Sequence, residues 1–301
     1  MIPQFPQFKK IELSDKEDVE KFTHQYPPYS DFNFVSMWSW DIRDEVQISQ
    51  LNGNLVVLFN DYLTDESFYS FLGNHKVNDT VKVLLDLSLK QNKNCQLKLL
   101  PEESIKNLNQ ELFIVEEDRD HFDYIFDVEK LSVYTGSDYA VKRTEVRRFL
   151  KKNEFIESRL IDISETKIKS DILRLNYDWL EHKKLKDPYF DIKNELIAID
   201  RFLNSKYKGR SCNIGIFCQN SLIGYSVNEL VSNDYAIGHF FKTNKHGSFE
   251  YLMKETSKYL SENNIKFLNF EQDLGINGLK KSKLSYRPVN FLKKYSITFK
   301  K

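Results

Sequence analysis

The 301-residue sequence has few of the features that mark specialised classes of protein. Its 3 cysteines are an odd number without CxxC spacing, so we expect reduced thiols and no metal site. The longest apolar run is LVVLF at 55–59, far below the ~18 residues of a membrane span. The first residues, MIPQFPQFKK, lack the pattern of a secretory signal. No Ser/His/Asp elbow, P-loop or HExxH motif is present, and we expect a cytoplasmic protein.

Glycine is also scarce, with 10 in the chain, yet two fall in one short stretch, FEQDLGINGLKKSKLSYRP at 270–288. Two acids precede these glycines and three lysines follow them. The stretch comes directly after the apolar run IKFLN, which predicts a strand. Because ligands in α/β sheets tend to bind beyond the carboxyl ends of strands, we expect a site here.

The side chains of this stretch predict a cleft with a base on one wall and an anion clamp on the other. Glu271 and Asp273 alternate along the strand end, which predicts that both point to one side as a base or as ligands of a cationic group. Gly275 permits a positive φ or a close approach to substrate. We expect the site to be completed by an anion-binding Lys283 and Arg287 and by a proton donor, Tyr286. The alternative is a capped turn with surface lysines.

What the sequence has in abundance is apolar and charged residues, at 41% and 29%. The formal net charge is zero, but it is divided unevenly along the chain. Residues 1–128 carry 12 Lys and Arg against 23 Asp and Glu, and residues 129–301 carry the other 32 against 21. This division favours an anionic partner for the second half. The alternative is a lysine-rich solvated surface.

The order of predicted elements is that of a mixed α/β fold. In the first half, EVQISQLNGNLVVLFND predicts a hairpin at Asn52-Gly53, and SDKEDVEKFTHQYP predicts a helix capped by Ser14. In the second half, two amphipathic helices precede a three-strand meander, a crossover helix and the strand IKFLNFEQ. We expect two domains, 1–128 and 129–301, the second repeating the plan of the first.

Four segments together resemble the phosphatidylglycerol lysyltransferase C-terminal domain family. They are FDYIFDVEKL (122–131), YAVKRTEVRRF (139–149), HFFK (239–242) and NFEQDLGINGLKKSKLSYRP (269–288). The resemblance implies two tandem GNAT-like acyltransferase domains, each a mostly antiparallel twisted sheet flanked by helices. It also implies transfer of an aminoacyl group from aminoacyl-tRNA to a lipid, peptide or small-molecule acceptor, with the second domain active.

Some positions depart from the family pattern. Phe241 stands where members carry an acid, and Ala140 and Thr144 stand where members often have His and Asn. The membrane domain of the lipid-modifying members is not in this sequence either. The identity of the substrate is therefore not carried over from the resemblance.

The strand DYAIGHFFKT precedes the crossover helix, and in GNAT enzymes the acyl donor lies beside this strand. His239 is a candidate acid–base residue and Lys242 a candidate substrate ligand, but their spacing predicts opposite faces unless a bulge intervenes. A hydrogen-bonded core histidine is an equal alternative for His239. Glu195 matches a glutamate that relatives place on the second amphipathic helix, where it would bind an amino group; the alternative is a surface acid.

A basic helix is predicted near 138–152. Residues spaced by four along it line adjacent stripes of one surface, which indicates contact with the phosphates of tRNA or of another polyanion. The alternative is a solvated helix face. The residues predicted to bind nucleic acid are Lys142, Arg143, Arg147, Arg148 and Lys151.

The donor is the most open question at this stage. A coenzyme A site needs several loop glycines to cradle the pyrophosphate, whereas KTNKHGSFE has Gly247 alone. This favours a donor without a pyrophosphate and no bound cofactor. Two alternatives stay open: an acyltransferase dependent on acetyl-CoA or acyl-CoA, and an inactive GNAT-like module that binds nucleic acid.

Overall fold

The computed structural model describes residues 1–61, 64, 66–91, 95–185, 187, 191–205, 207 and 209–300. These residues form a mixed α/β fold of largely antiparallel sheets flanked by helices, which confirms the predicted fold class. They divide into two compact units. The first unit is Met1–Tyr124, Gln272–Lys280 and Phe291–Lys301, and the second is Ile125–Glu271 and Lys281–Asn290. The first unit thus includes C-terminal segments that lie beyond the predicted boundary at residue 128, and the idea of two related halves stays a prediction.

The first unit contains two sheets, with strand orders β1-β2-β3-β4 and β5-β14-β6 among the described residues. The hairpin predicted at Asn52-Gly53 is confirmed, because both residues have positive φ and join β2 to β3. The strands are β1 (Lys9–Lys10), β2 (Gln47–Leu51), β3 (Asn54–Asn60), β4 (Ser67–Leu72), β5 (Leu97–Pro101), β6 (Phe113–Glu117) and β14 (Lys294–Phe299).

Four helices accompany these sheets: α1 (Lys16–Thr23), α2 (Phe34–Ser39), α3 (Val77–Lys90) and α4 (Glu102–Ile105). The apolar side of α3 packs into a core that includes Val56, Phe71 and Leu100. The predicted cap at Ser14 is wrong. A 3-10 turn precedes α1, and its capping box is formed by Glu12 and Asp15.

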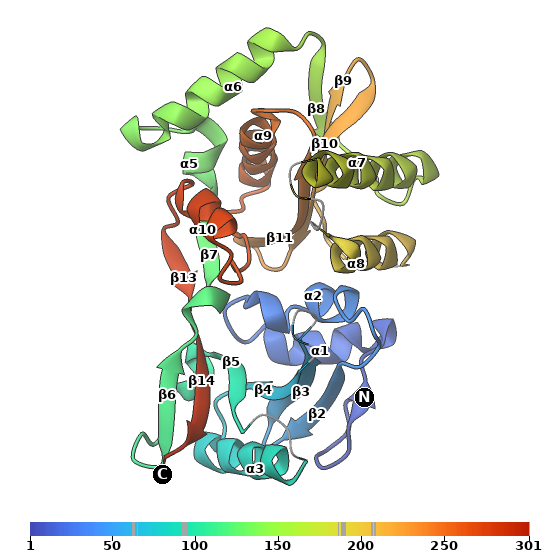
Figure 1. The fold of residues 1–301 in the computed structure, drawn as a ribbon. Coiled ribbons are helices and arrows are strands. Elements are labelled where there is room, and N and C mark those ends of the chain that lie inside the picture. The colour runs from blue at the N-terminus through green and yellow to red at the C-terminus, as the bar shows by residue number, and fades with distance from the viewer. Residues whose placement is uncertain are drawn as a thin grey trace. The chain divides into compact units, whose positions relative to one another are not determined.

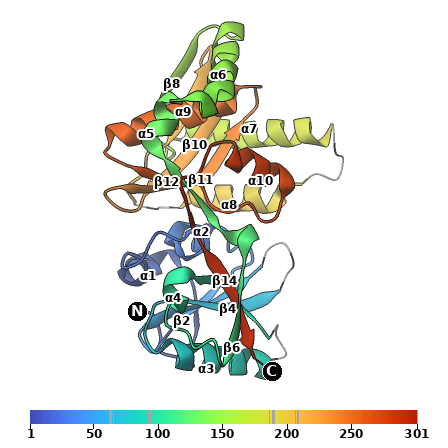
Figure 2. The ribbon, with the colours of Figure 1, turned by 90° about the vertical axis from the view of Figure 1, so that its left-hand side faces the viewer.

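The strand β14 lies between β5 and β6 in antiparallel pairing with both (Figure 1), and Figure 2 shows β14 beside β6 from another side. Sequence analysis did not identify this strand. Its partners lie roughly 180 residues earlier in the chain, and no local pattern encodes a pairing at that separation.

The second unit is built on a sheet with strand order β13-β7-β12-β11-β10-β9-β8, in which β7 and β13 also contain residues of the first unit. The β9–β11 meander is antiparallel, whereas β11 and β12 are parallel and are joined through α9, as the predicted crossover requires. The strands are β7 (Asp123–Asp127), β8 (Ile156–Leu160), β9 (Ile214–Cys218), β10 (Ser221–Leu230), β11 (Tyr235–Thr243), β12 (Phe267–Asn269) and β13 (Asn290–Leu292).

Helices cover both faces of this sheet. In Figure 1, α9 lies on one face, and α7 and α8 lie on the other. The helices that belong wholly to this unit are α5 (Val128–Val133), α6 (Ala140–Lys152), α7 (Thr166–Lys184), α8 (Lys193–Asn204) and α9 (Ser248–Glu262); α10 (Asn277–Leu284) contributes residues to both units. Within the described ranges, none of the helices is long and apolar enough to span a membrane.

Candidate active site

A β-bulge at His239 shapes the site in the second unit. Asn228 pairs with Gly238 and Val227 pairs with Phe240, so His239 is the extra residue in β11. A bulge of this kind shifts the alternation of side chains along a strand. It is the condition under which His239 and Lys242 were expected to share a face of the sheet.

The contacts around the bulge identify that face. The Tyr225 hydroxyl bonds to the Asn176 side chain of α7 at 2.9 Å, so Tyr225 faces α7, and alternation along β10 places Glu229 on the same face. His239 contacts Glu229, and Lys242 contacts α8. His239 and Lys242 therefore both point to the face covered by α7 and α8.

His239 is buried between two carboxylates. Its Nε2 lies 3.3 Å from Oε2 of Glu229, and its Nδ1 lies 3.3 Å from Oε1 of Glu271. Burial by itself would lower the pKa of His239, but the hydrogen bonds and charges of both glutamates outweigh it and raise the pKa to about 9. At neutral pH the ring is therefore an imidazolium, which cannot act as a base.

The carboxylates contact opposite nitrogens of the ring, so they lie on opposite sides of the imidazolium. Within the described part of the chain, no set of three or more His, Cys, Asp and Glu side chains could hold a metal ion. Glu271 is the exposed end of the arrangement, with 23% of its side chain accessible. A substrate can therefore reach the site at Glu271.

Lys242 and Glu195, both predicted to bind substrate, form an ion pair in the structure. The Lys242 ammonium lies 2.8 Å from the Glu195 carboxylate of α8 and 3.9 Å from the centroid of the Trp179 ring of α7. The lysine is buried, whereas the glutamate is partly exposed. Lys242 is therefore the partner that holds Glu195 at the surface of the site, and no sequence motif singles out Trp179.

The paired geometry predicted for Glu271 and Asp273 is wrong. β12 ends at Asn269, whose side chain accepts a hydrogen bond from the Glu271 amide at 2.8 Å. Glu271 and Leu274 then have φ of +54° and +55°, so the chain turns where an extended strand was expected. Glu271 belongs to the second unit and Asp273 to the first.

Asp273 is fully buried in the first unit, and both its oxygens are used there. Oδ2 accepts a hydrogen bond from the Tyr124 hydroxyl at 2.5 Å and lies 3.5 Å from Nη1 of Arg119, while Oδ1 accepts from the Gly275 amide at 2.9 Å. Burial and the hydrogen bond to Asp273 raise the pKa of Tyr124. This environment favours a structural role for Asp273, and its predicted catalytic role stays untested.

The rest of the 270–288 stretch is largely occupied by contacts within the units. Gly275 has a φ of +70°, the conformation expected of it. Lys283 donates to the Phe270 carbonyl at 2.5 Å, and Tyr286 is buried, which raises its pKa well above the usual range. Arg287 is exposed, with its guanidinium 3.8 Å from Asp138. Of the residues predicted to bind an anion here, Arg287 is the more accessible.

Helix α6 presents only part of its predicted basic surface. Lys142 is buried, with its ammonium 3.4 Å from Glu250 and 3.6 Å from the centroid of Tyr286, and burial lowers its pKa. Arg143 donates to the backbone carbonyls of Tyr134 and Gly136. These two side chains therefore serve the packing of the unit.

Three predicted residues stay on the outer face of α6. Arg147, Arg148 and Lys151 are exposed, although Arg148 also pairs with Glu145 at 2.8 Å. They form a basic stripe at the surface, and contact with nucleic acid stays a prediction for them.

The start of α9 is covered by α6. Gly247 caps α9 with a φ of +77°, and a Cβ added there would lie 3.1 Å from the Glu145 carbonyl oxygen and from Cβ of Phe149. The Glu145 carboxylate also lies 3.6 Å from the His246 ring. The side of Gly247 that faces α6 is therefore closely packed, and the identity of the donor stays a prediction.

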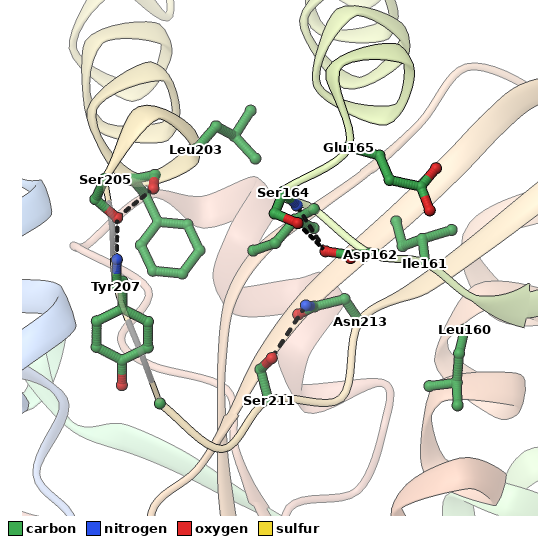
Figure 3. A pocket seen from close by; sticks show the side chains of 13 residues that line it. Leu160, Ile161, Asp162, Ser164, Glu165, Leu203, Ser205, Tyr207, Ser211 and Asn213 are labelled. Atoms are coloured by element: carbon green, nitrogen blue, oxygen red, sulfur yellow. Dashed lines mark hydrogen bonds between the residues drawn. The ribbon is translucent and has the colours of Figure 1, made fainter.

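Sequence analysis missed two polar residues of the site, Glu229 and Tyr207. Glu229 is buried on β10, and the Tyr207 hydroxyl donates to its Oε1. Tyr207 also lines a cavity of about 580 Å³, together with the β8–α7 loop, the end of α8 and the segment before β9. In Figure 3, Ser205 and Tyr207 stand on one side of this cavity and Ser164 and Asp162 on the other. The elements that meet here are far apart in the sequence, so no local motif marked them.

Comparison with solved structures identifies the class of fold. A conserved protein of unknown function from Bacteroides thetaiotaomicron has 24% identity and a TM-score of 0.83, with 100% of both chains covered. The structure of L-PGS from Bacillus licheniformis has 12% identity and a TM-score of 0.62 over 96% of this chain and 93% of that one. The C-terminal domain (DUF2156) of an Agrobacterium fabrum protein has 10% identity and a TM-score of 0.66, over 94% and 91%.

The family follows from the sequence match. The model of the family "Phosphatidylglycerol lysyltransferase, C-terminal" matches residues 24–298, and the chain belongs to this family. The resemblance seen in the four sequence segments is thus confirmed. None of the curated proteins matched the chain.

Proposed function

We propose that this protein is an aminoacyltransferase that moves an aminoacyl group from aminoacyl-tRNA to an amine or hydroxyl acceptor. Family membership supports the reaction class. The observation that carries the proposal is the accessible Glu271 carboxylate, which His239 holds just beyond the carboxyl end of β12. The second unit is the proposed catalytic unit.

In the proposed reaction, the acceptor nitrogen or oxygen attacks the ester carbonyl carbon of the donor. The bond between that carbon and the ribose oxygen of the tRNA breaks, and the acyl group stays on the acceptor. Glu271 accepts the proton that the acceptor loses and returns it to the leaving ribose oxygen. Glu195, held by Lys242, is placed to bind the ammonium of the aminoacyl group.

The donor is proposed from two features. The loop before α9 has Gly247 as its one glycine, packed against Glu145 and Phe149 of α6, and this favours a donor without a pyrophosphate. The exposed stripe of Arg147, Arg148 and Lys151 supports binding of tRNA phosphates. The proposed acceptor is a lipid headgroup, in keeping with the family, or a small amine.

The reaction is tested by offering a mixture of radiolabelled aminoacyl-tRNAs with phosphatidylglycerol vesicles or with a panel of amines. We expect label in an acceptor, and Glu271→Gln should lower turnover by ~10²-fold or more because acid–base help is lost. Glu262→Gln, at the exposed end of α9, is the matched control. Transfer by Glu271→Gln at the wild-type rate would show that Glu271 is not the base of the reaction.

The two alternatives give different results. An acyl-CoA enzyme would be stabilised by acetyl-CoA, by ~2.7 kcal/mol at 100 times its dissociation constant, and would transfer from it. A binding module would bind tRNA without transfer to any acceptor.

Binding of tRNA is tested by its dependence on salt. Contact with four to six phosphates should give a log–log slope of about -3 to -5. Reversing the charges of Arg147, Arg148 and Lys151 together should remove most of the binding, whereas the same change at the exposed Lys167, Lys258 and Lys266 should not. Equal binding by the two triple variants would remove α6 from the proposal.

A further inference from the structure

Four side chains form a continuous hydrogen-bonded line beneath the candidate site. The Tyr207 hydroxyl donates to Glu229 Oε1, Glu229 Oε2 contacts His239 Nε2, and His239 Nδ1 contacts Glu271 Oε1. The line begins at a residue that lines the cavity and ends at the accessible Glu271. Both carboxylate oxygens of Glu229 are thus used in holding its neighbours.

The positive charge of His239 and the negative charges of Glu229 and Glu271 stabilise one another in this buried line. Two ionised glutamates beside a neutral histidine would place two negative charges in a buried region with no cation between them. An imidazolium satisfies both, because each of its nitrogens then carries a proton to donate. Glu229 from β10 and Glu271 from the segment after β12 are titratable groups that contact His239, and Tyr207 contacts Glu229 from the segment after α8.

We propose that Glu229 is a positioning residue for the transfer reaction: it keeps His239 in its cationic form, and the cationic ring orients the Glu271 carboxylate toward the substrate. This inference rests on the proposed function, and it deepens the account of the same site. Glu229 does not touch the substrate, and no bond to His239 breaks during transfer. The proton of the acceptor goes to Glu271.

The proposal explains why a buried glutamate occurs on β10. Without a negative charge at position 229, the ring would lose the carboxylate beside its Nε2 and would release its proton more readily. A neutral ring can keep its single proton on either nitrogen, so the donor to Glu271 would no longer be assured. Glu271 would then sample other orientations, and turnover would fall without a matching change in substrate binding.

The test measures His239 directly, with ring carbon-13 labelling and NMR titration of the full chain. We expect the wild-type pKa of His239 near 9, and Glu229→Gln should lower it by about one unit or more. The transfer rate of Glu229→Gln at pH 7.5 should fall about 10-fold through kcat, with KM nearly constant and a pH profile displaced to lower pH. Tyr207→Phe is the matched control, because it removes a hydrogen bond from Glu229 but leaves its charge.

Each result decides the matter. Recovery of the His239 pKa and of kcat in Glu229→Asp would support the role of the charge. A wild-type His239 that titrates near 6.5 would overturn the proposal even if no variant folds, as would a pKa unchanged in Glu229→Gln or a shift of equal size in Tyr207→Phe. A shifted pKa with an unchanged kcat would also overturn it. The failure of the proposed function is recognised separately: the wild type would then transfer no label from aminoacyl-tRNA to any acceptor, while the His239 titration would still test the charge of the ring.

Discussion

Each unit contains a buried network of charged side chains, and the two networks differ in the solvent exposure of their members. In the first unit, the Lys294 ammonium pairs with Asp123 at 2.7 Å and with Asp31, and the side chains of these residues are 0%, 0% and 9% exposed. In the second unit, His239 and Glu229 are 1% and 7% exposed, but Glu271 is 23% exposed. One network is closed, and the other has an end that a substrate can touch.

This difference separates structural from chemical use of the same residue types. The Lys294 network also receives Ser30 and Gln272, so it joins elements from the start and the end of the chain within the first unit. Each of these groups contacts the Lys294 ammonium in the interior of the unit. Burial and ion pairing alone therefore do not mark an active site, and an accessible end is the distinguishing feature.

The largest effect is expected from opening the closed network. Lys294→Met would remove the ammonium that pairs with the buried Asp31 and Asp123 carboxylates, and breaking a buried ion pair in this way typically costs ~3–5 kcal/mol. Denaturant unfolding should show this loss, while transfer activity per folded molecule stays near that of the wild type. The control is Lys293→Met, since Lys293 is exposed beside Glu117 and should change stability little. Equal effects of the two variants would contradict the closed network.

The second network should reveal itself through pH. Because the pKa of His239 is raised from 6.5 to about 9 on folding, its contribution is fully present below pH 6.5 and is lost as pH rises through 9. The free energy of unfolding should fall over that window by about 3 kcal/mol at most.

The measurement is denaturant unfolding from pH 6 to 10 in the wild type and in His239→Gln, which should lose this part of the slope. The same measurement on His121→Gln gives the comparison for the first unit, because, against the effect of burial, the pKa of His121 is also raised by its hydrogen bond to Asp118. A slope that His239→Gln leaves unchanged would show that the ring is not charged in the folded protein.

A smaller effect is expected at Asp273, the acid that sequence analysis had grouped with Glu271. Asp273→Asn keeps the shape but weakens the bonds to Tyr124 and Arg119, so we expect a loss of roughly 1–2 kcal/mol in stability. Specific activity should stay intact, in contrast to Glu271→Gln. Measuring transfer rate and unfolding for both variants divides the roles, and a large drop in turnover in Asp273→Asn would restore its predicted place in the chemistry.

The sequence predicted those parts of the fold and site that have local signals. Sequence patterns predicted three features that each lie within about 30 consecutive residues: the Asn52-Gly53 turn, the β9–β11 meander and the crossover through α9. β14 was missed because its pairing is long-range. At the site, the sequence HFFK contains no local signal for the bulge at His239. The predicted pairing of Glu271 with Asp273 assumes an extended chain, whereas the strand ends at Asn269. Family resemblance supplied the fold, whereas the partner of His239 on β10 became visible only in three dimensions.

The smallest effect concerns the turn that carries the chain onward from Asp273. Gly275 has a φ of +70°, and a Cβ there would lie 2.8 Å from Oδ2 of Asp120. Gly275→Ala should therefore destabilise the protein by about 1 kcal/mol, since the left-handed backbone is unfavourable for alanine and the Asp120 side chain must move.

Gly278→Ala is a matched control, because Gly278 lies in α10 with no atom within 4 Å of an added Cβ. In an exposed helix alanine is favoured over glycine, so this control should be neutral or slightly stabilising. Melting temperatures of both variants test the prediction. If Gly275→Ala were as stable as Gly278→Ala, the turn at Gly275 would not depend on glycine.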